Sequence, residues 1–144
     1  MAPNSQYLSP EDVNYFGTTR RRVNDTFNLG SAQNLYQRQT AQSAFGRTKN
    51  NLFTSFARMR DKLPGQYASR GLLNSGLYQK GIADFGQRKN QQIGEVTAQF
   101  GEQMAGLDLA ERQLGQVRTS ASMDVDEQEQ SRIAAAASLL RAAR

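Results

Sequence analysis

Carboxylates and lysines are the residues with which this sequence could do acid, base or nucleophilic chemistry. Histidine, cysteine and tryptophan are absent, which excludes imidazole bases, thiol nucleophiles, disulfides and the usual zinc ligand sets. None of the lysines follows a serine in the Ser-x-x-Lys frame that serine catalysis without histidine would need. Five acids could supply a carboxylate pair for glycoside hydrolysis: Asp84, Glu95, Glu102, Asp108 and Glu111. Because they lie along a polar helical pattern, we interpret them as a solvated face.

One glycine-spaced segment imitates a phosphate-binding loop. Gly76 and Gly81 have the right spacing, but Ile82 and Ala83 stand where lysine and serine or threonine are required. The sequence therefore predicts a protein that is not an enzyme, with no catalytic residues, metal site, cofactor or small-molecule substrate.

Clustered cations are the remaining candidates for binding chemistry, because phosphate neutralisation needs such groups. The possible nucleic-acid contacts are Arg20, Arg21, Arg22, Arg58, Arg60 and Lys62. Residues 1–90 hold 13 cations against 5 acids, whereas residues 91–144 hold 5 against 8. This asymmetry is compatible with DNA contact, with head-to-tail pairing between copies, or with solvation alone. We favour a solvated helix face and keep DNA as a possible partner.

Composition limits the size of any hydrophobic core. Leucine, isoleucine, valine and phenylalanine make up only 28 of 144 residues, while glutamine and asparagine contribute 25. A chain this polar is expected to complete its core with other copies or partners. No apolar run approaches the roughly 20 residues needed to span a bilayer, and residues 1–10 lack the basic and apolar parts of a signal peptide. We therefore expect that the protein does not associate with a membrane. We expect it to assemble in a cytoplasm.

Helical spacing dominates the first part of the chain, the predicted basic helical region 1–63. Ser9 and Pro10 followed by two acids predict a helix start. We allow a break between residues 28 and 31, near Gly30, where the apolar pattern weakens. A second stripe ends at Leu63, where Pro64 and Gly65 predict the end of the helix. This stripe consists of Phe45, Leu52, Phe56, Met59 and Leu63.

Residues 64–76 predict a structured connector with its own role in assembly. Gly71 is expected to hold a positive φ, and Arg70 is placed to bond carbonyls exposed at the preceding helix end. Asn74 or Ser75 is a suitable cap for the next helix. The predicted turn and assembly residues are Pro64, Gly65, Arg70, Gly71, Ser75 and Gly76.

Residues 77–117 predict a long helix with an 11-residue repeat, which favours partners that are nearly straight or slightly right-handed. The predicted packing residues are Ile82, Phe85, Ile93, Gly94, Val96, Phe100, Gly101, Met104 and Leu107. Gly86, Gly94 and Gly101 form a strip that packs on the first helix or another copy, or else faces solvent. Residues 118–144 predict a separate helix, acidic and then alanine-rich, that docks on another chain or frays.

The connector also carries a resemblance. Its sequence Ala-x-Arg-Gly-Leu-x-x-Ser-Gly, residues 68–76, followed by a helix rich in glutamine, asparagine and arginine, resembles a pattern in small helical structural proteins of tailed-bacteriophage virions. The match covers residues 63–92 and implies a virion component present in symmetric copies.

These observations together predict a mostly α protein, an extended helical hairpin or coiled-coil-like bundle completed by oligomerisation. We expect a structural role in the tail or head-to-tail connector region of a virion, with copies of itself and other virion proteins as partners. A nucleic-acid-associated core protein and a scaffolding or assembly protein are the alternatives.

Overall fold

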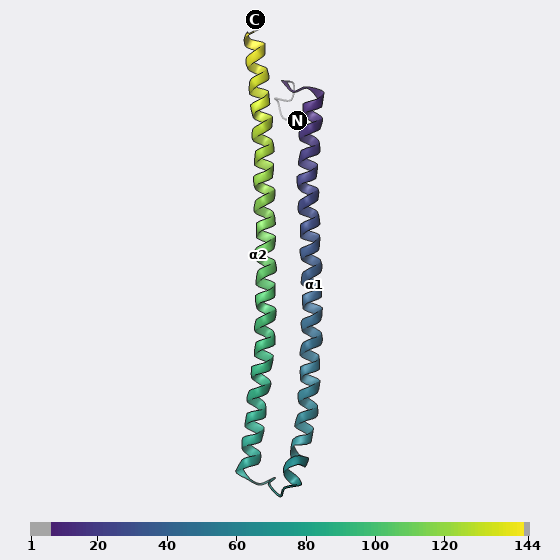
Figure 1. The fold of residues 1–144 in the computed structure, drawn as a ribbon, viewed down its shortest axis with the longest axis vertical. Coiled ribbons are helices and arrows are strands. Elements are labelled where there is room, and N and C mark those ends of the chain that lie inside the picture. The colour runs from purple at the N-terminus through teal and green to yellow at the C-terminus, as the bar shows by residue number, and fades with distance from the viewer. Residues whose placement is uncertain (1–6, 143–144) are drawn as a thin grey trace. The chain divides into compact units, whose positions relative to one another are not determined.

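Two long helices account for nearly all of the chain in a computed structural model that describes residues 7–142. Helix α1 covers Pro10–Ala68 and helix α2 covers Gly76–Ala142, and no strand occurs among the residues described. The helices pack against each other as a helical hairpin joined by the turn at residues 69–75 (Figure 1). The predicted mostly α fold and helical hairpin are therefore confirmed.

Helix α1 begins as its sequence predicts. The backbone N–H of Asp12 donates to Ser9 Oγ at 3.1 Å, and the Ser9 hydroxyl donates to Asp12 Oδ2 at 2.8 Å. Ser9 thus satisfies one of the N–H groups that every helix start leaves without an intrahelical acceptor, while Pro10 occupies a position where no N–H is needed. Residues 1–6, included in the predicted region 1–63, lie outside the described residues.

Two expected interruptions of α1 are wrong. The helix continues through residues 28–31, and it contains Pro64 and runs on to Ala68. Pro64 removes the backbone bond that its N–H would donate and crowds the carbonyl of Arg60. The turn beyond it is held by Tyr67, whose ring packs edge-on to Tyr78 with centroids 5.2 Å apart. Ring packing in the last turn therefore overrides the local stop signal.

The end of α1 is a Schellman motif centred on Gly71. Gly71 N–H donates to Ala68 C=O at 3.0 Å, and Leu72 N–H donates to Tyr67 C=O at 2.9 Å. Gly71 has φ +67°, the left-handed conformation that this motif requires and that other residues adopt only with strain. The expected positive φ is confirmed. Backbone N–H groups of the turn, rather than the Arg70 side chain, bond the carbonyls at this helix end.

Ser75 caps α2, because its hydroxyl oxygen accepts from Tyr78 N–H at 3.4 Å and its C=O accepts from the same N–H at 3.1 Å. From Gly76 onward the helix is continuous to Ala142, so no helix boundary separates the predicted regions 77–117 and 118–144. Residues 143 and 144 lie outside the described range.

The chain divides into two compact units. One combines Met1–Leu35 with Asp108–Arg144, and the other is Tyr36–Leu107, which contains the turn. Few side chains are fully enclosed in either unit. The described residues with less than a tenth of their surface exposed are Phe16, Asn34, Ala41, Phe56 and Val125.

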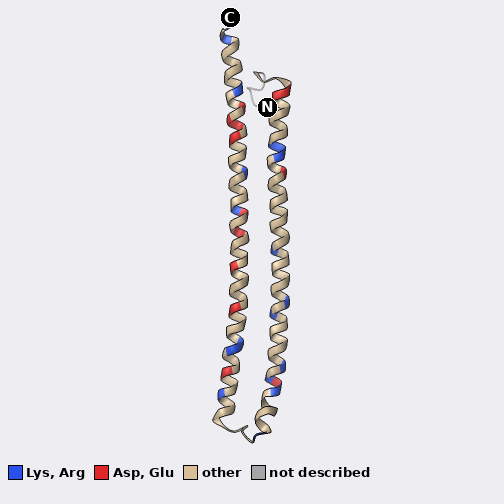
Figure 2. Ribbon diagram, viewed as in Figure 1, with Lys and Arg blue, Asp and Glu red and all other residues tan. Residues whose placement is uncertain are grey.

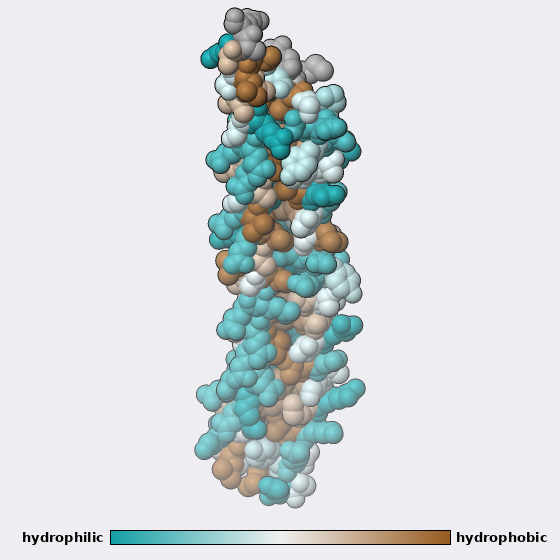
Figure 3. Space-filling model, turned by 45° about the horizontal axis from the view of Figure 1, so that its top comes forward, coloured by the Kyte–Doolittle hydropathy of each residue, from teal (hydrophilic) through white to brown (hydrophobic). Residues whose placement is uncertain are grey.

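Burial along each helix repeats every 11 residues, as the spacing of α2 predicted. On α1 the half-buried or buried positions include Asp12, Val23, Asn34, Phe45, Phe56 and Tyr67, which are successively 11 apart. On α2 Phe85, Val96 and Leu107 follow the same rule. Ile82, which was expected in this stripe, is 47% exposed. Figure 3 shows hydrophobic side chains along the seam between more hydrophilic flanks.

The predicted glycine strip does not contact α1. A Cβ built on Gly86, Gly94 or Gly101 meets no atom within 4 Å, so packing on the first helix is excluded for these glycines. Close approach occurs instead at Gly81. There a Cβ would overlap the Tyr67 hydroxyl and lie 2.9 Å from the ring carbon Cζ. Packing of the glycine strip on another copy stays a prediction.

We expect Gly71→Val to lower the free energy of unfolding by about 1–3 kcal/mol, because a β-branched residue is strained at φ +67°. Gly65→Ala is the matched control in the last turns of α1, where a Cβ meets nothing and removing a glycine should stabilise by up to about 1 kcal/mol. Urea denaturation followed by circular dichroism measures both. Equal stability of Gly71→Val and the unmodified chain would show that the Schellman turn is not required.

A second pair of substitutions tests the close approach on α2. Gly81→Ala should destabilise by about 1–3 kcal/mol, because the Tyr67 ring must move. Gly101→Ala should instead stabilise by about 1 kcal/mol, since its Cβ enters open space and alanine is the better helix former. Opposite signs in thermal denaturation support the packing described, and a stabilising Gly81→Ala would contradict it.

Candidate functional site

Aromatic pairs join the two helices of the unit Tyr36–Leu107. Phe45 and Phe100 stack with ring centroids 4.4 Å apart and an interplanar angle of 13°. Phe56 meets Phe85 edge-on at 5.6 Å, and Tyr67 meets Tyr78 in the same manner. Such pairs each contribute about 0.5–1.5 kcal/mol beyond the area they bury. These aromatic pairs therefore help to hold the two helices of this unit together.

Two lysines pack on the same aromatic layers. Lys49 Nζ lies 5.7 Å from the ring centroid of Phe45 and 5.9 Å from that of Phe53, and Lys89 Nζ on α2 lies 5.6 Å from the Phe53 ring. Their aliphatic stems line the seam while their charges sit over ring faces. A positive charge is thus built into the packing of a unit that holds ten cations and four acids, a net charge of +6.

Charge pairs take over in the unit that combines residues 7–35 and 108–142. Arg20 pairs with Asp126 at 2.6 Å and also with Glu129, and Arg132 pairs with Asp12 at 2.8 Å. In Figure 2 basic residues of α1 and acidic residues of α2 lie across from one another in this unit. The basic N-terminal cluster and the acidic stretch of the sequence are therefore partly matched within one chain.

Hydrogen bonds to Asp126 and then Glu129 raise the pKa of Arg20 above its ordinary value, against an opposing effect of burial. A cation whose pKa is raised by folding stabilises the fold at every pH below its ordinary pKa. This stabilisation is lost only in strong alkali. Arg20 therefore stays charged at any pH at which the protein would be studied. Its side chain is 41% exposed, so solvent screens the pair and limits its contribution.

The other predicted nucleic-acid contacts are all exposed: Arg21, Arg22, Arg58, Arg60 and Lys62. Arg60 bonds the neighbouring Asp61 at 3.1 Å, with both side chains more than two-thirds exposed. Arg20 is thus drawn into the seam, while the rest of the predicted set stays on the surface in two different units.

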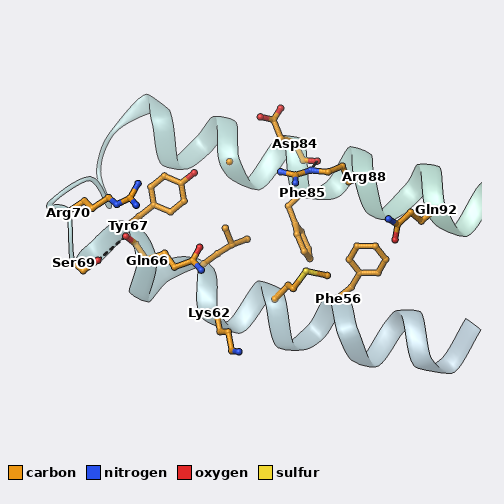
Figure 4. A pocket seen from close by; sticks show the side chains of 13 residues that line it. Phe56, Lys62, Gln66, Tyr67, Ser69, Arg70, Asp84, Phe85, Arg88 and Gln92 are labelled. Atoms are coloured by element: carbon orange, nitrogen blue, oxygen red, sulfur yellow. Dashed lines mark hydrogen bonds between the residues drawn. The ribbon is translucent and has the colours of Figure 1, made fainter.

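A cavity of about 670 Å³ lies next to the turn, between the end of α1 and the start of α2. Figure 4 shows Phe56, Phe85 and Tyr67 between the two helices, Arg70 beside the turn, and Arg88 on α2. The Lys62 side chain points away from the gap. The lining residues are Phe56, Met59, Lys62, Leu63, Gln66, Tyr67, Ser69, Arg70, Gly81, Asp84, Phe85, Arg88 and Gln92.

The cavity combines an apolar floor with a mostly cationic rim. Phe56 is buried, Phe85 and Tyr67 are half-buried, and Met59 is 45% exposed. Asp84 is the only acid in the lining, against the cations Arg70 and Arg88, since the third lining cation, Lys62, points away from the gap. This arrangement suits an acidic ligand that also carries an apolar group.

The sequence predicted a role for some of these residues, but it did not predict the cavity that they line. Arg70 and Lys62 were predicted for two different purposes, and the structure brings both to this cavity. Arg88 and Gln66 were missed. Arg88 lies one turn from Phe85, at the edge of the buried stripe, and this position could have indicated it. Whether such a residue lines a cavity depends, however, on which residues of the opposite helix lie across from it. Of the acids considered for catalysis, Glu95 accepts from Gln91 on the same helix at 3.1 Å, and Glu111 accepts from the Ser31 hydroxyl on α1.

None of the described helices has a stretch that is long and apolar enough to cross a membrane. Comparison with known proteins found no matching family model, no matching curated protein and no matching solved structure.

We expect Arg20→Ala to lower the free energy of unfolding by about 0.2–1 kcal/mol, because it removes a half-exposed double pair with Asp126 and Glu129. The loss should shrink as salt is raised. Arg21→Ala, which removes an exposed cation from the next position, should have a smaller effect. Equal effects of the two substitutions in urea denaturation would show that the pair does not stabilise the seam.

Proposed function

We propose that this protein is a non-enzymatic structural component of a tailed-bacteriophage virion that acts by helix-helix assembly. The exposed surface is the observation that carries the assembly role. The chain exposes 11079 Å², whereas a compact domain of its 16.0 kDa mass exposes about 7400 Å². Surface that remains exposed in one chain is available to other copies and other virion proteins. The tail or head-to-tail connector region is the proposed position.

The turn supports the virion assignment. Residues 68–76, which resemble the phage pattern, form one continuous turn. Gly71 adopts the left-handed conformation at the end of α1, and Ser75 caps the start of α2. Gly71 and Ser75 therefore each have a structural reason to occur at their positions. A segment with this defined geometry is a suitable point for contact between neighbouring chains.

Association with packaged DNA is the second candidate. The net charge of +6 on residues 36–107 and the exposed cations Arg58, Arg60 and Lys62 favour it. DNA binding whose log affinity falls by several units per unit of log salt would support this role, because each neutralised phosphate releases counterions. A shallow slope would leave the cations as a solvated face.

Mass spectrometry of purified particles tests the proposal. We expect the chain in mature virions of the phage that encodes it, and we expect Gly71→Val to lower particle yield more than Glu102→Gln, an exposed acid on α2. Presence in immature heads only would assign the chain to scaffolding. Wild-type particle yield from Gly71→Val would remove the turn from the assembly mechanism.

A further inference from the structure

Arg88 Nε donates to the backbone C=O of Asp84 at 3.4 Å. The cavity beside the turn nevertheless has more basic than acidic side chains. Its rim carries Arg70 and Arg88, both exposed, and the single acid Asp84 leaves the site net positive. The aromatic rings of its floor are engaged with one another, Phe56 with Phe85 and Tyr67 with Tyr78. Phe56 is buried and Phe85 and Tyr67 are half-buried, so little ring face is exposed for base stacking, which argues against single-stranded nucleic acid as the occupant.

An apolar side chain flanked by carboxylates fits this site better. The exposed part of the floor includes the thioether of Met59, a flexible group that adapts to an inserted apolar partner. The guanidinium groups of Arg70 and Arg88 can each bond a carboxylate through two N–H groups. A helix that presents one apolar residue between acids would satisfy both features.

The same chain carries such a helix face on α2. Met123 is 61% exposed, and Glu127, four residues on, shares its face of the helix. Asp124 lies next to Met123 and is also exposed. Unlike Asp126 and Glu129, which pair with Arg20, neither Asp124 nor Glu127 forms an ion pair among the described residues.

We propose that the cavity beside the turn of one copy binds the Met123, Asp124 and Glu127 face of a second copy. Met123 of the second copy contacts the apolar floor, and its two free carboxylates meet Arg70 and Arg88. The contact joins two different surfaces, so a pair of copies still has one free cavity and one free Met123, Asp124 and Glu127 face. Further copies can therefore add to form a ring or a chain. This inference rests on the proposed assembly function and specifies one of its contacts.

Charge exchange in the full-length chain tests the contact. By sedimentation velocity at about 50 mM salt, where surface charges are weakly screened, we expect Arg88→Glu or Glu127→Arg alone to weaken self-association by about tenfold or more. In an equimolar mixture of the two single variants, every contact between unlike copies pairs opposite charges, so alternating copies should associate again. The double variant Arg88→Glu with Glu127→Arg should return to within about threefold of the unmodified chain. Met123→Ser should weaken association without changing the charge.

Two controls separate this contact from net charge. Lys80→Glu and Glu102→Arg make the same charge changes at exposed positions outside the cavity and outside the acidic face, and should alter association by less than about twofold. Circular dichroism checks that every variant remains helical. Equal weakening by Lys80→Glu and Arg88→Glu, failure of the double variant to recover, or an unmodified chain that stays monomeric would each overturn the proposal.

The outcomes also separate this contact from the proposed function. If the chain is found in virions but its self-association does not depend on Arg88 and Glu127, the structural role is supported and this contact is refuted. If the chain is absent from virions but its self-association responds to the charge exchange as expected, the contact is supported and the phage assignment is refuted. Binding of a labelled DNA oligonucleotide that Arg88→Glu abolishes, while self-association is unchanged, would make the cavity a nucleic-acid site and overturn the inference.

Discussion

A narrow seam that repeats every 11 residues is the constraint on which the rest of the structure depends. On α1 only about three positions in each repeat face α2, as Phe45, Lys49 and Leu52 show, and the steps of 4, 3 and 4 return to Phe56. So narrow a stripe cannot enclose many side chains, and two helices have no third layer to cover their other faces. Polar flanks, exposed glycines and the small number of buried residues all follow from this geometry.

The two units meet this constraint with different chemistry. Residues 36–107 use aromatic pairs, and even the seam lysines Lys49 and Lys89 lie over rings. The unit built from residues 7–35 and 108–142 uses Arg20 and Arg132 with acids of the opposite helix, and Arg118 lies 4.7 Å from the Phe27 ring centroid while bonding Asn24. Aromatic packing is insensitive to salt, whereas half-exposed ion pairs weaken with it. High salt should therefore loosen the second of these units first.

Local rules predicted the parts of the fold that are set by a few consecutive residues. The caps at Ser9 and Ser75 and the positive φ of Gly71 belong to this class, since each depends on bonds within one turn of chain. Pro64 inside α1, the partners of Arg20 and the role of Gly81 depend on which residues of the other helix lie opposite. One helix pattern fixes a face but not its register against a second helix, and so the cavity lined by Arg70 and Arg88 could not be derived from spacing.

We propose that the hairpin is incomplete alone and is completed by contact with other copies. Hydrogen exchange of the full-length chain, followed by mass spectrometry at low and at high protein concentration, measures this directly. Weak protection along both helices of the dilute chain is expected, because a narrow seam opens at low free-energy cost, and protection should rise as copies associate. Strong protection that does not change with concentration would contradict the claim, because it would show that the two helices form a complete structure without any partner.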